Sequence, residues 1–161
     1  MILLKSKKAV SIVSLFMVIG WMFLIISFSS DPADISASKS KAVLERVEPA
    51  VEKMEESLKI QIADDGRLHF YVRKNAHMFN YFVLAMLVAT CLRLSGVKGF
   101  RSYILAYIVV TLFSAMDEYY QMFIPGRSGE VRDVMVDNAG VVMGLVAAWL
   151  LPAINKLKRI F

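Results

Sequence analysis

Acidic side chains interrupt two strongly apolar stretches of this chain. Asp117 and Glu118 lie near the end of one stretch, and Asp133 and Asp137 lie at the start of the next. Because an ionisable side chain in a hydrocarbon layer is costly, such residues usually have a function or a specific partner. A carboxyl group of a crowded pair can serve as an acid, and a histidine can serve as a base. The candidates for catalysis are therefore His77, Asp117, Glu118 and Asp137.

Basic and amide side chains accompany these carboxylates. Arg127 and Arg132 could hold phosphate or carboxylate through paired donors, to which a planar guanidinium is suited, and Lys74 could add a point charge. Amide and carboxylate side chains could then contact hydroxyls and amides of the same ligand. The candidate ligand-binding residues are Arg73, Lys74, His77, Asp117, Glu118, Gln121, Arg127, Arg132, Asp133, Asp137 and Asn138.

The spacing of these residues does not match a known metal motif. His77, Asp117, Glu118 and Asp137 could bind a divalent ion, but no pair of histidines stands at helical spacing beside a glutamate. The sequence also lacks a Ser or Cys nucleophile motif. We therefore expect no metal and no cofactor, and the sequence leaves open whether the protein is an enzyme.

Four apolar runs could carry these residues across a membrane. A helix needs about 20 residues to cross a hydrocarbon core of about 30 Å. The runs cover residues 9–28, 76–92, 102–123 and 134–151, and 57% of all residues are hydrophobic. The first run is longer than the apolar part of a signal peptide, so we interpret it as an uncleaved anchor. The sequence predicts an all-α integral membrane protein with four transmembrane helices.

Lysine and arginine are unevenly distributed around these runs. Because basic flanks stay on the cytoplasmic side, the pattern predicts that both termini are cytoplasmic and that the polar segments meet at the outer leaflet. The net charge of +5 is explained by these flanks. It predicts contact with anionic membrane lipids, whereas nucleic-acid binding would need an aromatic and basic surface that the chain lacks. The flanking residues are Lys5, Lys7, Lys8, Arg93, Lys98, Arg101, Lys156, Lys158 and Arg159.

Helical spacing predicts that the polar residues form one stripe on each of three helices, because residues three and four apart share a face. Gly140 and Gly144 are a pair of small residues that lets another helix approach closely. Residues 124–127, Ile-Pro-Gly-Arg, predict a tight turn that directs Arg127 over the polar cluster. The stripes are Arg73, His77, Asn80 and Tyr81; Ser114, Asp117 and Gln121 with Glu118 beside them; and Asp133, Asp137, Gly140 and Gly144.

A polar segment, residues 29–70, separates the first two runs. Apolar residues at helical spacing predict an extracytoplasmic amphipathic helix that lies on the lipid interface or the bundle, or binds a partner. Pro49 predicts a kink or a new helix start, and Asp65-Gly66 a turn. The predicted organisation is a first span (1–28), this segment (29–70), a three-span region (71–152) and a basic tail (153–161). The apolar residues are Leu44, Val47, Val51, Met54 and Leu58.

One ordered set of residues resembles the VanZ-like membrane protein family. The set comprises His77, Asp117-Glu118-x-x-Gln121, Pro125-Gly126-Arg127, Asp133, Asn138, Gly140 and Gly144, and the resemblance covers residues 71–151. It implies a small multi-pass protein of the bacterial cell membrane, in a family named for a protein associated with glycopeptide-antibiotic resistance. We therefore expect a role in the envelope or antibiotic response.

Three functions are compatible with the polar cluster. It could bind an anionic or glycosylated envelope molecule, such as a lipid-linked cell-wall precursor or a glycopeptide. It could act as a membrane-embedded acid–base enzyme or an ion-coupled carrier. It could also be structural, with Arg73, Lys74, Arg127 and Arg132 neutralising Asp117, Glu118, Asp133 and Asp137. The sequence ranks binding above catalysis, and it does not give the ligand or the oligomeric state.

Overall fold

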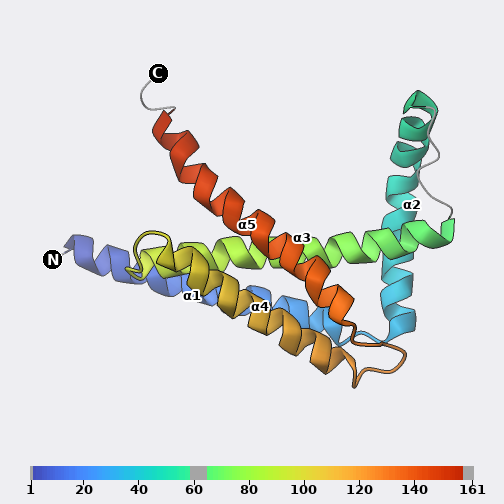
Figure 1. Cartoon of the computed structure of the whole chain (residues 1–161), viewed down its shortest axis with the longest axis horizontal. Helices are drawn as coiled ribbons and strands as arrows, with labels where there is room; N and C mark the ends of the chain where they lie inside the picture. Colours follow the sequence, from blue (N-terminus) through green and yellow to red (C-terminus); the bar gives the residue numbers. More distant parts are fainter. Residues whose placement is uncertain (1, 59–64, 158–161) are drawn as a thin grey trace.

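Five α-helices form the described part of the chain, residues 2–58 and 65–157 of a computed structural model (Figure 1). They are α1 (Ile2–Ser29), α2 (Ala33–Leu58), α3 (Asp65–Leu94), α4 (Arg101–Gln121) and α5 (Val131–Leu157). No strand occurs within these two ranges. The predicted all-α class is confirmed.

Three of the described helices are long and apolar enough to cross a membrane. The segments are Lys8–Ser29 in α1, Tyr71–Leu94 in α3 and Val131–Leu151 in α5. They agree with three of the four predicted spans. The fourth, α4, does not reach the same apolar character, because a helix of 21 residues that contains Asp117, Glu118 and Gln121 has little room for a purely apolar stretch.

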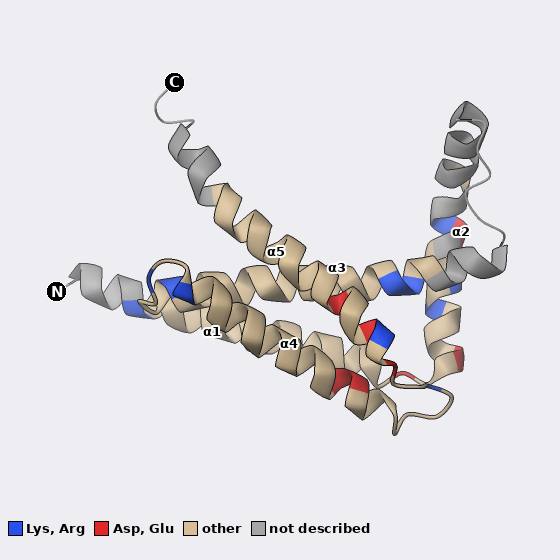
Figure 2. Cartoon of the chain, viewed as in Figure 1, with Lys and Arg blue, Asp and Glu red and all other residues tan. Residues whose placement is uncertain are grey.

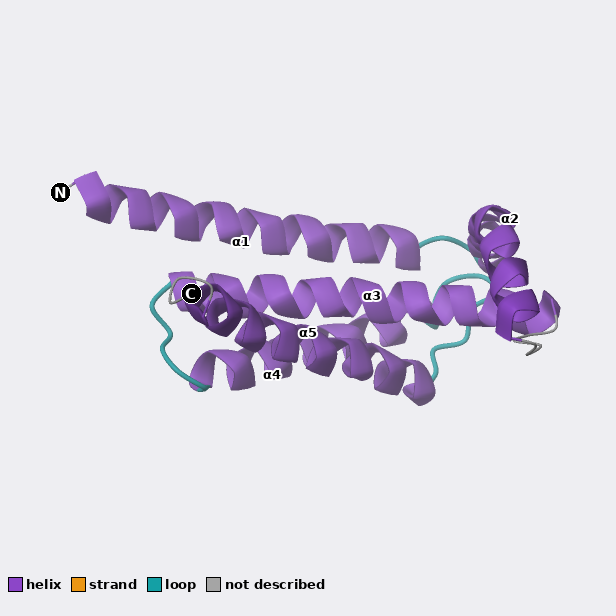
Figure 3. Cartoon of the chain, turned by 90° about the horizontal axis from the view of Figure 1, so that it is seen from above, coloured by secondary structure: helices purple, strands orange, loops and turns teal. Residues whose placement is uncertain are grey.

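The central helix is α3, which packs against α1, α4 and α5. Figure 3 shows α1 on one side of α3 and the α4–α5 pair on the other. Small and aliphatic residues such as Ala85, Ala89, Ala106 and Val110 are fully buried between the helices. Large apolar side chains, among them Phe23, face outward. This distribution suits a bundle that is surrounded by lipid tails rather than by water.

The closest helix contact joins α5 to α3. A Cβ added at Gly140 would overlap the carbonyl oxygen of Met78, and one added at Gly144 would overlap that of Phe82. The two backbones therefore touch along one face of α5, as the small-residue pair predicts. Figure 1 shows the two helices crossing and then diverging toward the C-terminal end of α5.

The segment between α1 and α3 differs from the prediction in one respect. Asp65 and Gly66 begin α3 instead of forming a turn, because both residue types are also compatible with a helix start. Helix α2 continues through Pro49, which excludes the new helix start and leaves the kink as the remaining alternative of that prediction. Residues 59–64, which join the two helices, lie outside the described residues. The side chains of the predicted apolar face, Leu44, Val47, Val51, Met54 and Leu58, also lie outside them.

Candidate functional site

The polar residues of α3, α4 and α5 gather at one end of the bundle, where α1 and α4 end and α5 begins. Figure 2 shows the acidic residues of α4 and α5 at this end, with basic residues of α3 close by. The hydroxyl of Tyr81 donates a hydrogen bond of 3.1 Å to Asp117 Oδ2, and Ser114 Oγ donates one of 2.9 Å to Asp137 Oδ2. The three predicted stripes therefore converge.

Asp117 connects three helices. Its Oδ2 accepts hydrogen bonds from Ser29 Oγ of α1 at 2.7 Å, from Tyr81 of α3, and from Gln121 Nε2 of its own helix at 3.2 Å. Ser29 is buried and is not among the site residues predicted from the sequence. Its position at the polar end of the first apolar run is the sequence feature that could have indicated a role in the site. The other oxygen, Asp117 Oδ1, has no hydrogen-bond partner among the described residues.

Asp137, Glu118 and His77 lie next to this connection. Asp137 is 1% exposed, and its Oδ1, which lacks a hydrogen-bond partner among the described residues, lies 3.9 Å from His77 Nδ1. Glu118 Oε1 accepts a hydrogen bond of 3.2 Å from Gln121 Nε2, and Glu118 Oε2 accepts one of 3.3 Å from the backbone N–H of Glu130. Both carboxylates are therefore held in place without an ion pair to a lysine or arginine of the described residues.

The predicted network of ion pairs is mostly absent from the described residues. Lys74 pairs with Asp133, but no lysine or arginine nitrogen of this part of the chain lies within ion-pair distance of Asp117, Glu118 or Asp137. Hydroxyl and amide groups on neighbouring helices take the place of the expected cations. Among the described residues, direct ion pairing between these four basic and four acidic residues is found only for Lys74 and Asp133.

Arg127 reaches the cluster through the predicted turn. Gly126 has a φ of +74°, and the N–H of Arg127 donates to the carbonyl of Ile124 at 3.1 Å, which closes the turn. The guanidinium donates to the carbonyl oxygens of Phe28 at 3.1 Å and Asp31 at 2.8 Å, and to Gln121 Oε1 at 2.9 Å.

These three bonds fasten the α4–α5 loop to the end of α1. Burial lowers the pKa of the Arg127 guanidinium, and nearby Arg73 adds to this effect, while Asp31, Asp117 and Glu118 oppose it. A guanidinium stays charged at physiological pH even so.

A polar cavity of about 80 Å³ opens beside the turn. Among its basic residues, Arg73 has no hydrogen-bond or ion-pair partner within the described part of the chain. Ser128, Gly126 and Glu130 also contribute to the lining, although the sequence reasoning did not propose them as ligand-binding residues. The lining consists of Arg73, Lys74, His77, Gln121, Gly126, Arg127, Ser128, Glu130 and Asp133.

Five predicted ligand-binding residues are not part of this lining: Asp117, Glu118, Arg132, Asp137 and Asn138. Arg132 is exposed. Asn138 connects two helices instead: its Oδ1 accepts a hydrogen bond of 2.6 Å from Thr111 Oγ1, and its Nδ2 donates one of 2.8 Å to the carbonyl of Val134.

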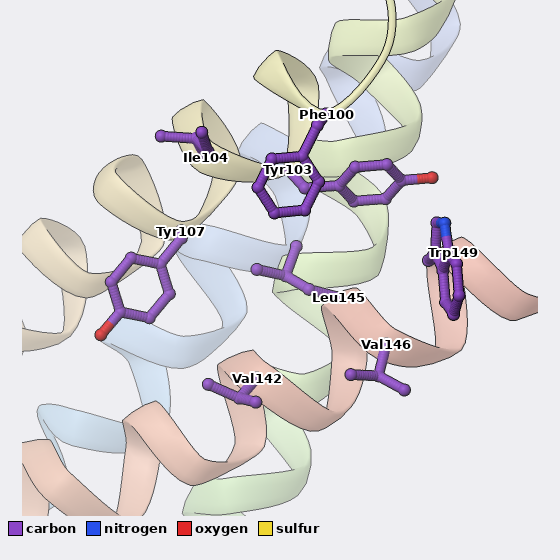
Figure 4. A pocket seen from close by; sticks show the side chains of 8 residues that line it. All are labelled: Phe100, Tyr103, Ile104, Tyr107, Val142, Leu145, Val146 and Trp149. Carbon is purple, nitrogen blue, oxygen red and sulfur yellow. The ribbon is translucent and has the colours of Figure 1, made fainter.

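A larger cavity, of about 460 Å³, lies between α4 and α5 toward the opposite end of the bundle. Figure 4 shows aromatic and aliphatic side chains of both helices around it. No charged group lines it, so it offers nothing to an anionic headgroup, whereas lipid tails fit its chemistry. Its lining is Phe100, Tyr103, Ile104, Tyr107, Val142, Leu145, Val146 and Trp149.

Comparison with known families supports the resemblance suggested by the polar residues. The model of the VanZ/LLP1 family matches residues 14–152. The chain belongs to the VanZ/LLP1 family. This match extends beyond the resemblance at residues 71–151 and takes in most of α1 and all of α2, so the VanZ/LLP1 region includes most of the first span. Together with the membrane-type helices, it makes this chain a VanZ-like membrane protein. No curated protein and no solved structure matches the chain.

Proposed function

We propose that this VanZ/LLP1 protein binds the phosphate group of an anionic envelope lipid, such as a lipid-linked cell-wall precursor, in the polar cavity. The observation that carries the proposal is the position of Arg73, which lines the cavity with Lys74 and Arg127 and has no partner among the described residues. A guanidinium forms strong charge-assisted hydrogen bonds to phosphate. Arg73 is therefore the anchor for the anion.

Three cations and two carboxylates, those of Glu130 and Asp133, line the cavity, so the charge of its lining favours an anion. Arg127 is occupied by three hydrogen bonds, and Lys74 pairs with Asp133, so neither offers as many open donors as Arg73. The three cations repel one another at close range in a site of low dielectric. A bound phosphate relieves this repulsion.

The size of the cavity restricts the ligand. A water molecule needs roughly 10–15 Å³ of such space, and a pocket for a drug-sized molecule has roughly 300–1,000 Å³. With about 80 Å³, the cavity accommodates a single phosphate or carboxylate group. A whole glycopeptide is too large for it, so the rest of the ligand lies outside the cavity, in the lipid and the headgroup layer.

The arrangement of the helix ends supports an outward-facing site. The N-terminal end of α1 and the C-terminal end of α5 lie opposite the end of the bundle at which α1 and α4 end and α5 begins (Figure 3). Figure 2 shows basic residues around the α3–α4 connection on that same side. By their position in the chain these are Arg93, Lys98 and Arg101. By the positive-inside rule this side is cytoplasmic, so α4 crosses as a fourth span and α2 lies outside the bacterial cytoplasmic membrane.

We place this binding in the envelope or glycopeptide-antibiotic response. Both the phosphate chemistry of lipid-linked wall precursors and the association from which the VanZ family takes its name support this role. A protein that holds such a precursor at the outer leaflet would change how much of it an antibiotic can reach.

The proposal is tested by direct binding of a lipid-linked wall precursor to the purified full-length protein in nanodiscs. Loss of a charge-assisted contact of about 1.5–3 kcal/mol predicts that Arg73→Ala weakens binding roughly tenfold to hundredfold. Arg132→Ala is the matched control, because it removes the same charge from an exposed position outside the cavity. Arg127 is unsuitable as the test position, since it also holds the end of α1.

Two results would contradict the proposal. The first is that the wild-type protein binds neither the precursor nor a simpler lipid phosphate. The second is that Arg73→Ala and Arg132→Ala bind as tightly as the wild type.

A further inference from the structure

One histidine and two carboxylates from three different helices form a compact group beside the polar cavity. His77 of α3, Glu118 of α4 and Asp137 of α5 each offer one potential ligand atom, and the three atoms lie within 4.8 Å of one another. Glu118 and Asp137 are buried, and His77 is partly buried. We propose that these residues bind a divalent transition-metal ion such as Zn²⁺ or Mn²⁺, independently of phosphate binding.

The distances are close to those of a metal site. Ligand atoms at about 2.0–2.2 Å from an ion lie roughly 3–3.5 Å from one another. His77 Nδ1 and Asp137 Oδ1 are 3.9 Å apart, which is beyond hydrogen-bond length. An approach of roughly 1 Å, within reach of small side-chain rotations, brings the three atoms onto a common ion.

A second observation that supports a metal site is that the Oδ1 atom of Asp137 has no hydrogen-bond partner among the described residues. The side chain is 1% exposed, its Oδ2 is held by Ser114, and its Oδ1 faces His77 without a hydrogen-bond partner among the described residues. A buried carboxylate oxygen without a partner is costly. A metal ion between Asp137 and His77 supplies that partner.

The surroundings of the group also resemble those of metal sites. Ligating carboxylates are usually oriented by hydrogen bonds from a second layer of residues. Ser114 plays this role for Asp137, and Gln121 together with the backbone N–H of Glu130 plays it for Glu118. Because no described lysine or arginine lies within ion-pair distance of either carboxylate, their negative charges are left for a cation to neutralise.

The donor set indicates the class of metal. Mg²⁺ and Ca²⁺ prefer sites made of oxygen atoms alone, whereas an imidazole nitrogen with carboxylate oxygens suits Zn²⁺ and, with more oxygen ligands, Mn²⁺. Three protein ligands leave at least one coordination position for water or another ligand. Since His77 also lines the polar cavity, ions can enter from that side.

The test uses full-length protein that has been stripped with a chelator in detergent. We expect calorimetric titration with Zn²⁺ to show one equivalent bound, and Mn²⁺ to give an electron paramagnetic resonance signal with coupling to an imidazole nitrogen. His77→Ala and Asp137→Asn should each weaken Zn²⁺ binding by about tenfold or more. His69→Ala, which changes the only other histidine of the chain, should bind like the wild type.

A further variant distinguishes a failure of the metal proposal from a failure of the phosphate proposal. Arg73→Ala should retain Zn²⁺ binding, so a failure of the phosphate proposal does not decide the metal proposal. All variants are compared at matched size-exclusion profiles, which removes misfolded protein from the comparison. Absence of Zn²⁺ and Mn²⁺ binding to the wild type would show that protons rather than metal neutralise Asp137. Equal binding by the wild type, His77→Ala and Asp137→Asn would place any bound ion elsewhere, and either result overturns the proposal.

Discussion

At the scale of single residues, the distinctive feature is that buried carboxylates are satisfied by hydroxyl and amide groups rather than by cations. Asp117 receives donors from α1, α3 and α4, and Asp137 receives one from α4. In a low-dielectric interior, each of these hydrogen bonds is stronger than it would be in water. The acidic residues therefore connect helix ends while keeping one oxygen each, on Asp117 and Asp137, for other partners.

Removing one donor from Asp117 should destabilise the protein. Ser29→Ala deletes the 2.7 Å hydrogen bond to a buried carboxylate, so we expect a loss of about 1–3 kcal/mol and a fall in the unfolding temperature of several degrees. The neighbouring Ser30→Ala is the control, because the Ser30 hydroxyl contacts the carbonyl of Ile26 and the hydroxyl of Tyr120 but no buried carboxylate. Thermal unfolding in detergent measures both. Equal unfolding temperatures for the two variants would show that the Ser29 bond contributes little.

At the scale of elements, the α3–α5 contact sets the position of the site. The backbones of these helices touch at Gly140 and Gly144, only a few residues from Asp137. Gly140 contacts Met78, which directly follows His77 in the chain. The close approach of the two helices therefore places Asp137 next to His77. A change in the separation of the two helices would therefore change the geometry of the site.

A methyl group at this contact should separate the helices. Gly140→Ala places a Cβ against the carbonyl of Met78, and a clash with backbone cannot be relieved by a side-chain rotation. We expect a loss of about 1–3 kcal/mol, seen as a lower unfolding temperature, together with weaker metal binding. Gly20→Ala in α1 is the control, because nothing lies within 4 Å of its added Cβ and alanine favours helix. An unfolding temperature of Gly140→Ala at or above that of Gly20→Ala would show that α5 is not held this closely to α3.

At the scale of the whole molecule, the two ends of the bundle differ in chemistry. One end holds the polar cavity and the buried carboxylates, while the loop at the other end carries basic residues beside an apolar cavity (Figures 2 and 4). Such a division matches a protein whose ends face different sides of a membrane. It also separates the charged groups that can hold a headgroup from the surface that contacts lipid tails.

The proposed topology predicts that the α4–α5 loop and the α3–α4 loop are accessible to a labelling reagent from opposite sides of the membrane. In a Cys91→Ser background, Ser128→Cys in the α4–α5 loop should react with a membrane-impermeant maleimide in intact cells. Lys98→Cys, in the α3–α4 loop, should react only after lysis. Both positions are exposed, so access to the side chain does not limit the reaction. Labelling of both from the same side would show that α4 does not cross the membrane, and the opposite pattern would reverse the orientation.

Features that depend on neighbouring residues could be predicted from the sequence. Helical periodicity and apolar length predicted the all-α class and four spans, three of which correspond to described helices. Pro125-Gly126 predicted the turn at Arg127, and the glycine spacing predicted a close helix contact. The three- and four-residue spacing of the polar side chains predicted one stripe on each of three helices, because residues at these spacings share a helix face. The turn predicted at Asp65-Gly66 was wrong, because both residue types suit a helix start as well as a turn.

Which groups meet depends on the tertiary structure. Partners such as Ser29 and Asp117 are far apart in the chain, and their contact depends on how each helix is rotated and how closely it packs. The rotation and packing of the helices place the Arg127 guanidinium against backbone carbonyls instead of carboxylates. They also place His77 next to Asp137. Charge pattern alone suggests that cations pair with anions, whereas packing determines which donors come within about 3 Å of a buried oxygen. The site is therefore a product of helix packing, and its chemistry follows from the groups that packing leaves without partners.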